Sequence, residues 1–562
     1  MIGGTRKCIF IGINEEQLMK NEAKYSGKII DVIDRVIFSG VITVKNGMIQ
    51  SIEKAEGVDD QYILPGFIDG HIHIESSMLV PSEFARLASV HGTVAAVSDP
   101  HEIANVLGIK GVEFMVENAS TVPFKFYFGA PACVPATPFE TAGAQIDSSD
   151  LETLFQKKDI LYLSEMMNIP GVLNDDPNEL NKIALARKYG KRIDGHAPEL
   201  CGDAAEKYVN SGITTDHECV TLEEAREKIS YGGTIQIREG SAAKNLDDLM
   251  PLIDEFPEKV MFCSDDRHPD DLVESHIGDL VIRAKNLGYD LFNILQAACV
   301  NPVTHYGLNV GLLQTGDPAD FIIIDNLDEM NILSTYVNGV KIADINGPLL
   351  STQTVEKVNV FNAVKKSMGD FEVPACKDQM RVIDVIDGQL ITKSSLVTPK
   401  IEDGCAVQDI DRDLLKIAVI NRYQNEKPAI AFIRNFGLKS GAIASSVAHD
   451  SHNIVAVGAT DVDLCNAVNL VIRHRGGVCA VNGGDELIIP LPIAGIMSDG
   501  DGYKVAKQYA ELDQFAKQIG STLNAPFMTL SFMALLVIPE LKLSDQGLFD
   551  GKSFKFTPLF TG

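Results

Sequence analysis

The sequence of 562 residues predicts an α/β protein: a (β/α)8 TIM-like barrel inserted in a small composite β-sandwich, followed by a C-terminal α/β domain. Three observations lead to this fold class. Between residues 63 and 268, short β-rich runs alternate with segments of helical period, as in a parallel sheet built from βα units. Asn-Gly hairpin signatures lie on both sides of that region. A further set of strands and helices follows residue 374.

Eight candidate strands account for the barrel. Segments such as 178–189 and 204–211 separate them as helices. Eight βα units in roughly 200 residues match a (β/α)8 barrel, whose active site forms where the strands reach their C-terminal ends. Because the polar and ionisable residues fall at those ends, we expect the functional site there. The strands are predicted to end near His73, Pro100, Val134, Asn168, His196, Glu218, Gly240 and Asp265.

The two flanks of the barrel carry similar hairpins, at residues 44–49 (VKNGMI) and 336–341 (YVNGVK). Both lie among short alternating strands, so we expect the flanks to meet in space as one β-sandwich. The predicted domains are residues 1–65 (first part of the sandwich), 66–308 (barrel), 309–370 (second part of the sandwich) and 371–562 (C-terminal α+β domain).

The composition excludes several classes of partner. With 49 basic and 77 acidic residues, the formal charge is −28 at pH 7, which repels nucleic acid phosphates and anionic lipid. No apolar stretch reaches the ~18 residues needed to span a bilayer. Met1 to Lys7 lacks the start of a secretory signal, and the 10 cysteines include no C-x-x-C pair. We therefore expect a cytoplasmic protein with reduced cysteines that binds neither nucleic acid nor membranes.

The most informative motif is the pair His71 and His73, which ends an apolar run. On a β-strand, residues i and i+2 project from the same face, so both imidazoles can reach one metal ion. Four more candidate ligands fall at later strand ends: Glu165, His196, His217 and Asp265. Six ligands are too many for one tetrahedral ion and suit two, with a carboxylate bridging them and a shared water polarised into hydroxide.

These motifs make the sequence similar to the amidohydrolase superfamily and, within it, to the adenine deaminase family of bacteria and archaea. The broader resemblance rests on residues 65–73 (PGFIDGHIH), on the strand-end histidines and Asp265, and on residues 301–302 (NP) and 316–320 (GDPAD). The narrower one covers nearly the whole chain. It rests on residues 71–77 (HIHIESS), 99–106 (DPHEIANV), 164–168 (SEMMN), 262–267 (FCSDDR) and 445–453 (SSVAHDSHN).

The resemblance implies two divalent ions per chain, Mn²⁺ or Fe²⁺ before Zn²⁺. His71 and His73 would hold one ion with Asp265, His196 and His217 the second, and Glu165 would bridge them. Glu165 stands where many cyclic amidases of the superfamily have a carboxylated lysine, which argues against those activities. The H-x-E and P-C-x-x-C arrangement of cytidine deaminases is also missing from the sequence.

The implied reaction is the hydrolytic deamination of adenine to hypoxanthine and ammonia, in purine salvage. Glu165 and Asp265 are the implied catalytic residues, with Asp265 as proton shuttle beside a metal-bridging hydroxide. Two alternatives stay open: a binuclear amidohydrolase acting on another aminated heterocycle or a cyclic amide, and a non-catalytic barrel homologue that binds a partner.

Polar residues beside the strand ends are candidates for binding the purine. They are His101, Glu102, Arg238, Glu239, Ser264 and Asp266. For Arg238 and Glu239 a structural ion pair is the alternative, and Glu102 could instead cap a helix that begins near residue 103. His449 and His452 in the C-terminal domain are candidates for a lid over the barrel mouth or for a polar turn. The apolar strands of the flanking domains suggest a homodimer or a higher homo-oligomer.

Overall fold

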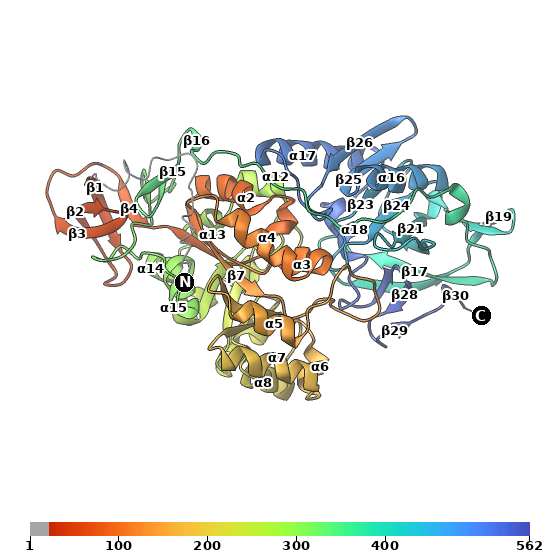
Figure 1. Cartoon of the computed structure of the whole chain (residues 1–562), viewed down its shortest axis with the longest axis horizontal. Helices are drawn as coiled ribbons and strands as arrows, with labels where there is room; N and C mark the ends of the chain where they lie inside the picture. The colour runs from red at the N-terminus through yellow and green to blue at the C-terminus, as the bar shows by residue number, and fades with distance from the viewer. Residues whose placement is uncertain (1–21, 562) are drawn as a thin grey trace, which may run out of the picture.

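The computed structural model describes residues 22–561. Residues 1–21 lie outside this range. They include Cys8, the first part of the 1–65 segment and the N-terminal residues that are predicted to lack a secretory signal. Figure 1 shows three parts in a row along the long axis: a β-sheet unit that contains the beginning of the described chain, a central barrel, and a C-terminal unit coloured cyan to blue.

The β-sheet unit is one eight-stranded sheet built from both flanks of the barrel. The strand order is β16-β15-β14-β13-β4-β1-β2-β3, and the flanks join where β13 pairs antiparallel with β4. The N-terminal strands are β1 (Ala23–Asp31), β2 (Val36–Lys45), β3 (Met48–Lys54) and β4 (Tyr62–Pro65), and the later strands are β13 (Phe321–Ile324), β14 (Ile332–Val337), β15 (Val340–Asp344) and β16 (Gly347–Pro348).

This sheet curls upon itself, which gives the predicted composite sandwich. The ring of Tyr25 in β1 lies 5.0 Å from that of Tyr336 in β14, although two strands separate β1 from β14 in the sheet. Both predicted hairpins are present. At the first, Asn46 and Gly47 have φ angles of 53° and 76°, the left-handed conformation that an Asn-Gly turn provides.

The eight parallel strands of the predicted barrel follow in chain order. Hydrogen bonding splits them into β5 to β9 and β10 to β12. The barrel closes because Asp265, after the last strand, donates its N–H to the carbonyl of His71 (3.0 Å) and accepts the N–H of His73 (3.3 Å). The strands are β5 (Phe67–Ile72), β6 (Thr93–Ser98), β7 (Lys125–Ala130), β8 (Ile160–Met166), β9 (Arg192–Gly195), β10 (Thr215–Asp216), β11 (Thr234–Arg238) and β12 (Val260–Cys263).

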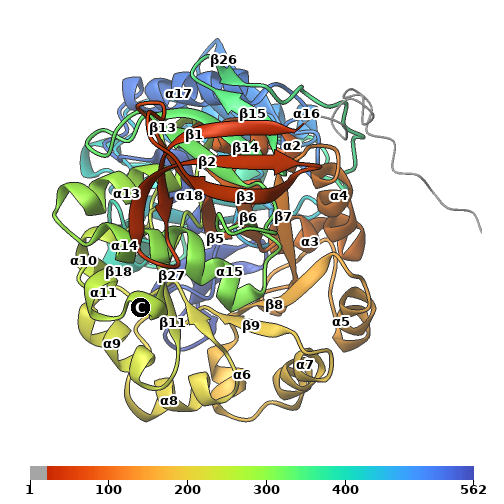
Figure 2. The same cartoon turned by 90° about the vertical axis from the view of Figure 1, so that its left-hand side faces the viewer.

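Helices surround these strands, as Figure 2 shows. The predicted helices at 178–189 and 204–211 are α7 and α8. Asp176 caps α7 by accepting the N–H of Asn178, and Pro177 occupies the first turn, where a missing N–H costs nothing. The helices are α2 (Pro81–Ala88), α3 (His101–Leu107), α4 (Ile109–Ala119), α5 (Ser148–Phe155), α6 (Ile169–Leu173), α7 (Pro177–Lys188), α8 (Gly202–Asn210), α9 (Leu222–Ser230), α10 (Leu246–Leu249), α11 (Leu252–Glu255), α12 (Pro269–Glu274), α13 (Ile277–Asn286), α14 (Leu291–Leu295) and α15 (Asn301–Tyr306), with short turns η1 (Ile74–Ser77), η2 (Ser89–His91), η3 (Pro257–Lys259) and η4 (Gln296–Val300).

The C-terminal unit is built on a mostly antiparallel sheet with the order β18-β17-β22-β21-β24-β23-β25-β26, to which β30 adds beside β17. Two smaller sheets pair β19 with β20 and β27 to β29. Its elements are η5 (Met368–Phe371), β17 (Gln379–Val385), β18 (Thr392–Val397), β19 (Lys400–Glu402), β20 (Cys405–Val407), η6 (Ile410–Arg412), β21 (Leu415–Ile420), β22 (Ala429–Arg434), β23 (Ala442–Ser445), β24 (Ile454–Gly458), α16 (Asp461–His474), β25 (Gly477–Asn482), β26 (Asp485–Pro490), α17 (Gly502–Gln518), α18 (Pro526–Phe532), β27 (Leu541–Ser544), β28 (Gly547–Asp550), β29 (Lys555–Phe556) and β30 (Phe560–Thr561).

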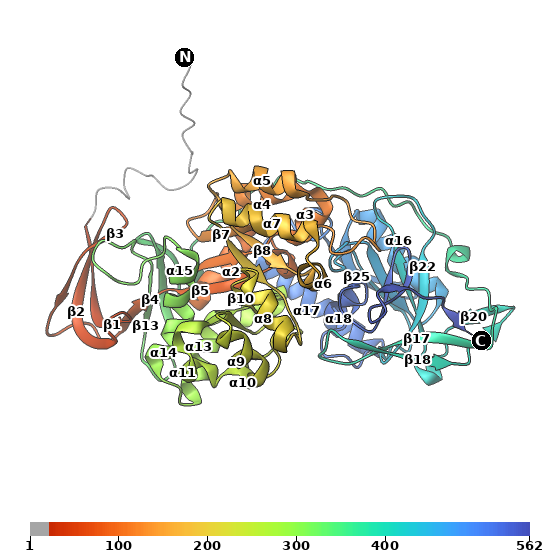
Figure 3. The ribbon, with the colours of Figure 1, turned by 90° about the horizontal axis from the view of Figure 1, so that it is seen from below.

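The C-terminal unit packs against the barrel at the end where the site residues gather (Figure 3). Helix α17 packs on α2 and α12. At this contact Glu83 accepts the N–H of Gly502 (2.9 Å), and Arg86 donates to Asp501 (2.9 Å). The N–H of Thr141 donates to Asp545 (3.0 Å) at a second point of contact. The C-terminal unit therefore covers the barrel mouth.

The described residues can be compared with the expectations on membrane-spanning segments and on reduced cysteines. None of the helices in residues 22–561 is long and apolar enough to cross a membrane. The nine cysteines in this range are free thiols, six of them buried.

Candidate metal and substrate site

The six candidate ligands lie at one end of the barrel because their strands run parallel. His71 is the penultimate residue of β5, Glu165 lies at the end of β8, and His217 directly follows β10. Asp265 follows β12 with a φ of 55°. Asp tolerates this left-handed conformation better than most residues, because its short side chain bonds locally. Parallel strands thus bring residues that are far apart in sequence to one edge.

Glu165 lies at the centre of the cluster. Its Oε1 is 2.7 Å from His71 Nε2, 2.9 Å from His73 Nε2 and 3.6 Å from His217 Nε2. Its other oxygen, Oε2, is 3.2 Å from His196 Nδ1. Asp265 approaches the same histidine pair, with Oδ1 3.2 Å from His73 Nε2 and 3.6 Å from His71 Nε2. One carboxylate therefore faces all four histidines.

The donor set fits metal ions. The ligand atoms of His71, Glu165, His217 and Asp265 lie within 4.8 Å of one another, and all four residues are buried. The Nε2 atoms of His71 and His73 are 3.2 Å apart, so both ring nitrogens can contact one ion. Burial lowers the pKa of His71, but the carboxylates of Asp265 and Glu165 outweigh it and raise the pKa to about 10. The cluster thus favours cations, and buried histidines and carboxylates are the ligands that first-row divalent metals prefer.

A buried arginine supports the cluster from one side. Arg238, at the end of β11, donates from Nη1 to Asp265 Oδ2 (2.7 Å) and also bonds Glu218 through both terminal nitrogens. Glu218 in turn lies 3.5 Å from His217 Nε2. Burial opposes ionisation of Asp265, but Arg238 and the histidines hold its pKa well below the usual range. Asp265 is therefore an anion at rest.

The second barrel strand contributes His101 and Glu102 at the start of α3. His101 Nδ1 pairs with Asp99 Oδ2 at 2.9 Å. Glu102 does not cap the helix, because that place is taken by Glu75, whose Oε1 accepts the N–H of Ile103 (3.1 Å). The carboxylate of Glu102 instead turns toward the C-terminal unit.

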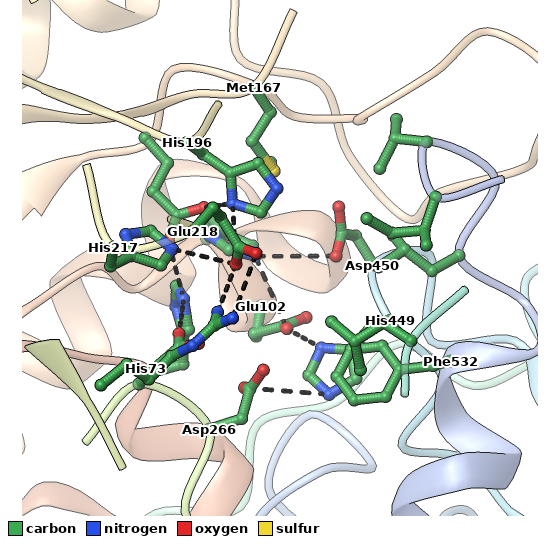
Figure 4. Close-up of a pocket in the computed structure, with 18 residues that line it drawn as sticks. His73, Glu102, Met167, His196, His217, Glu218, Asp266, His449, Asp450 and Phe532 are labelled. Carbon is green, nitrogen blue, oxygen red and sulfur yellow. Dashed lines mark hydrogen bonds and ion pairs between the residues drawn. The ribbon is translucent and has the colours of Figure 1, made fainter. Parts of the chain in front are cut away.

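That unit supplies the far wall of the pocket, as Figure 4 shows. Glu102 pairs with His449 Nδ1, and its Oε2 is 2.5 Å from His452 Nε2, although this second contact lacks hydrogen-bond geometry. The ring of Phe532 stacks on that of His449, with centroids 4.8 Å apart and planes 10° apart. The C-terminal unit adds His449, Asp450, Leu390, Phe532, Leu535, Val537 and Ile538 to the lining.

The predicted substrate residues divide into two groups. His101, Glu102, Arg238 and Asp266 line the pocket, but Glu239 and Ser264 are not among its lining residues. Glu239 accepts from Arg283 Nη1 (2.8 Å), and Ser264 donates its N–H to Asp69 (3.0 Å). Each follows or precedes a lining residue in the sequence, but its own side chain is buried in structural contacts outside the pocket.

Several lining residues were not among the predicted site residues: Glu218, Met167, Asp450, Phe532 and their apolar neighbours. Glu218 follows His217 directly, so its position at a predicted strand end could have indicated that it belongs to the site. The free volume of the pocket is about 30 Å³, room for about two waters. A larger cavity of about 400 Å³ lies next to it and shares Leu390 and Phe532. Those two side chains separate the inner pocket from the outer cavity.

The two halves of this pocket match two families. Residues 62–342 match the amidohydrolase family, and residues 389–555 match the adenine deaminase C-terminal domain. Among relatives, adenine deaminase of Salinibacter ruber is 55% identical over 95% of this chain and 98% of its own length. Adenine deaminase of Sulfurovum sp. is 55% identical over 94% and 98%, and that of Methanosarcina mazei 52% identical over 96% and 99%. The chain therefore belongs to the adenine deaminase family, within the amidohydrolases.

Proposed function

We propose that this protein hydrolyses adenine to hypoxanthine and ammonia and serves purine salvage. The observation that carries the proposal is the joint pocket. A cluster of four histidines and two carboxylates at the barrel mouth is enclosed by a C-terminal unit of the adenine deaminase type. The domain boundaries 1–65, 66–308, 309–370 and 371–562, a cytoplasmic location and a homo-oligomeric state belong to the same proposal.

The cluster would hold two divalent ions. In this assignment His71, His73 and Asp265 bind one ion, His196 and His217 bind the other, and Glu165 contacts both. The central position of Glu165 supports it, because its two oxygens face different histidines. Manganese or iron is favoured by the family likeness, and zinc suits the same donors. When bound, such ions activate water as a nucleophile at neutral pH.

Asp265 would carry the proton transfers. Its carboxylate is ionised, so it can accept a proton as attack on the ring carbon proceeds and return it to the departing amine. Arg238 holds Oδ2, which leaves Oδ1 on the side of His73. Because both terminal nitrogens of Arg238 are engaged by Asp265 and Glu218, its proposed role is to orient Asp265 and not to bind the purine.

His101, Glu102 and Asp266 are the proposed purine contacts from the barrel, with His449 and His452 closing the pocket as a lid. The histidines around Glu102 support this assignment: a carboxylate paired with imidazoles can share protons with a ring nitrogen. Glu239 and Ser264 are left out of the proposed contacts because neither lines the pocket.

The test is an ammonia-release assay on purines, pyrimidines and cyclic amides after reconstitution with each metal. Adenine as the preferred substrate would support the proposal. Turnover of a cyclic amide without adenine turnover would favour another amidohydrolase activity. Failure on all substrates by a chain that carries its metals would favour the non-catalytic alternative.

A further inference from the structure

Asp450 is a buried carboxylate of the pocket without a hydrogen-bond partner. It comes from the C-terminal unit and is 3% exposed. Its Oδ2 is sealed from solvent and bonds none of the described residues. The nearest basic atom to Oδ1 is His101 Nε2 at 3.7 Å, beyond hydrogen-bond distance. A buried acceptor left unpaired costs about 1–3 kcal/mol, so this position favours a ligand that donates.

The other two carboxylates on this side of the pocket are already engaged. Asp266 accepts the hydroxyl of Ser76 (2.5 Å), and Glu102 pairs with His449. Asp450 differs from Asp266 and Glu102 because neither of its oxygens makes a hydrogen bond with the described residues, whereas each of the other two carboxylates has one oxygen engaged. Figure 4 shows it across the pocket from His196 and His217.

This placement decides which edge of a purine it can meet. If the proposed function holds, the amino-bearing carbon of adenine faces the histidine cluster. The edge farthest from that carbon carries N3 and N9, and N9 bears a hydrogen only in the free base. A carboxylate can accept that N–H but cannot donate to a substituted nitrogen.

We propose that Asp450 accepts a hydrogen bond from the imidazole-ring N–H of the bound purine and thereby selects the free base over N9-substituted purines such as nucleosides. The inference rests on the proposed function and names a specificity-determining residue for it. The C-terminal unit also lines the pocket with apolar side chains, among them Leu535, Val537 and Ile538, and these support the same selection. A ribose at N9 would place hydroxyls against these side chains without partners.

The test compares adenine with 9-methyladenine, which lacks the N–H, in the metal-loaded wild type and in Asp450→Ala and Asp450→Asn. Wild type should prefer adenine by ~10²-fold or more in kcat/KM, because a site built for an N–H rejects the analogue without it. Asp450→Ala should reduce this preference by roughly 10- to 100-fold, chiefly because kcat/KM for adenine falls. Asp450→Asn should keep part of it, since the amide oxygen still accepts.

Binding provides a readout that does not depend on turnover. Calorimetric Kd values for hypoxanthine and 9-methylhypoxanthine should show the same loss of discrimination in Asp450→Ala. Asp545→Asn is the matched control. Asp545 is also a buried carboxylate of the C-terminal unit near the barrel, but it accepts from Thr141 and Asn421 and lies outside the pocket. Its replacement should leave both ratios unchanged.

An unchanged ratio in a folded, metal-loaded Asp450→Ala that still deaminates adenine overturns the role of Asp450 and leaves the proposed function intact. A wild type that turns over no adenine and binds no hypoxanthine overturns the proposed function, and the Asp450 inference with it.

Discussion

Arg238 Nη1 donates to Asp265 Oδ2 at 2.7 Å, while the other oxygen of the same carboxylate lies 3.2 Å from His73 Nε2. The two oxygens of Asp265 thus face different neighbours, a fixed guanidinium and the histidine cluster. This division suits the proton-transfer role proposed for Asp265, because one oxygen is held in place while the other faces the site.

Replacing Asp265 by Asn should abolish most turnover. The amide keeps the shape and one oxygen but cannot accept a proton, so kcat should fall by ~10² to 10⁴ while adenine binding largely survives. Steady-state kinetics with metal content measured in parallel will check this. A near-normal kcat with both metals bound would contradict the proton-transfer role.

Replacing Arg238 by Gln should weaken both stability and turnover. The change leaves the buried carboxylates of Glu218 and Asp265 without their cation, which costs about 3–5 kcal/mol for a buried pair. We expect a lower unfolding midpoint and a kcat reduced by less than in Asp265→Asn, because Asp265 loses its orientation but not its basicity. Thermal unfolding and kinetics on the same preparation will measure the two effects. Arg283→Gln, which removes an ion pair with Glu239 outside the pocket, is the control.

The barrel could be predicted because its signals are local. Each strand is a short β-rich run bounded by turns, and β5, β8 and β12 end within two residues of the predicted positions. β7 ends earlier than predicted, at Ala130 in place of Val134, because the polypeptide leaves the sheet before its apolar run stops. Parallel topology then brings the six ligand candidates together without further information.

Of the far wall of the pocket, only the candidate lid residues His449 and His452 could be named from the sequence, since the contacts of this wall are not local. Nothing in the sequence near Asp450 or Phe532 indicates that either residue lines a pocket at the barrel mouth. The same limit applies to Glu239 and Ser264: both stand at strand ends, but the register that turns them away from the pocket depends on neighbouring strands. The pairing of β4 with β13 was predicted as a meeting of flanks, but not as one continuous sheet.

Replacing Glu165 by Gln should impair metal retention more than Asp265→Asn does. Glu165 faces four histidines, and the neutral amide loses the charge that would hold two cations close together. Elemental analysis after manganese loading and dialysis should find close to two ions in wild type and clearly fewer in Glu165→Gln. Equal metal content in the two variants would rule out a bridging position for Glu165.

Two partly buried histidines outside the site, His91 and His305, should make the protein less stable in mild acid. Burial, assisted by His276, lowers the pKa of His91 to about 4, and burial also lowers the pKa of His305 to about 3. In the unfolded chain an ordinary histidine titrates near 6.5. Between about pH 6.5 and 4 the unfolded state therefore binds more protons than the folded state, so stability falls as pH falls through this window.

The pair His91→Gln and His305→Gln should flatten this dependence, because a neutral amide takes up no proton in either state. Each replacement should remove up to about 1.4 kcal/mol per pH unit from the slope of unfolding free energy against pH. Unfolding midpoints measured from pH 4.5 to 7 in wild type, both variants and the double variant will test the prediction, with the exposed His474→Gln as control. If the double variant lost stability toward acid as steeply as wild type, carboxylates and not these histidines would account for the acid sensitivity.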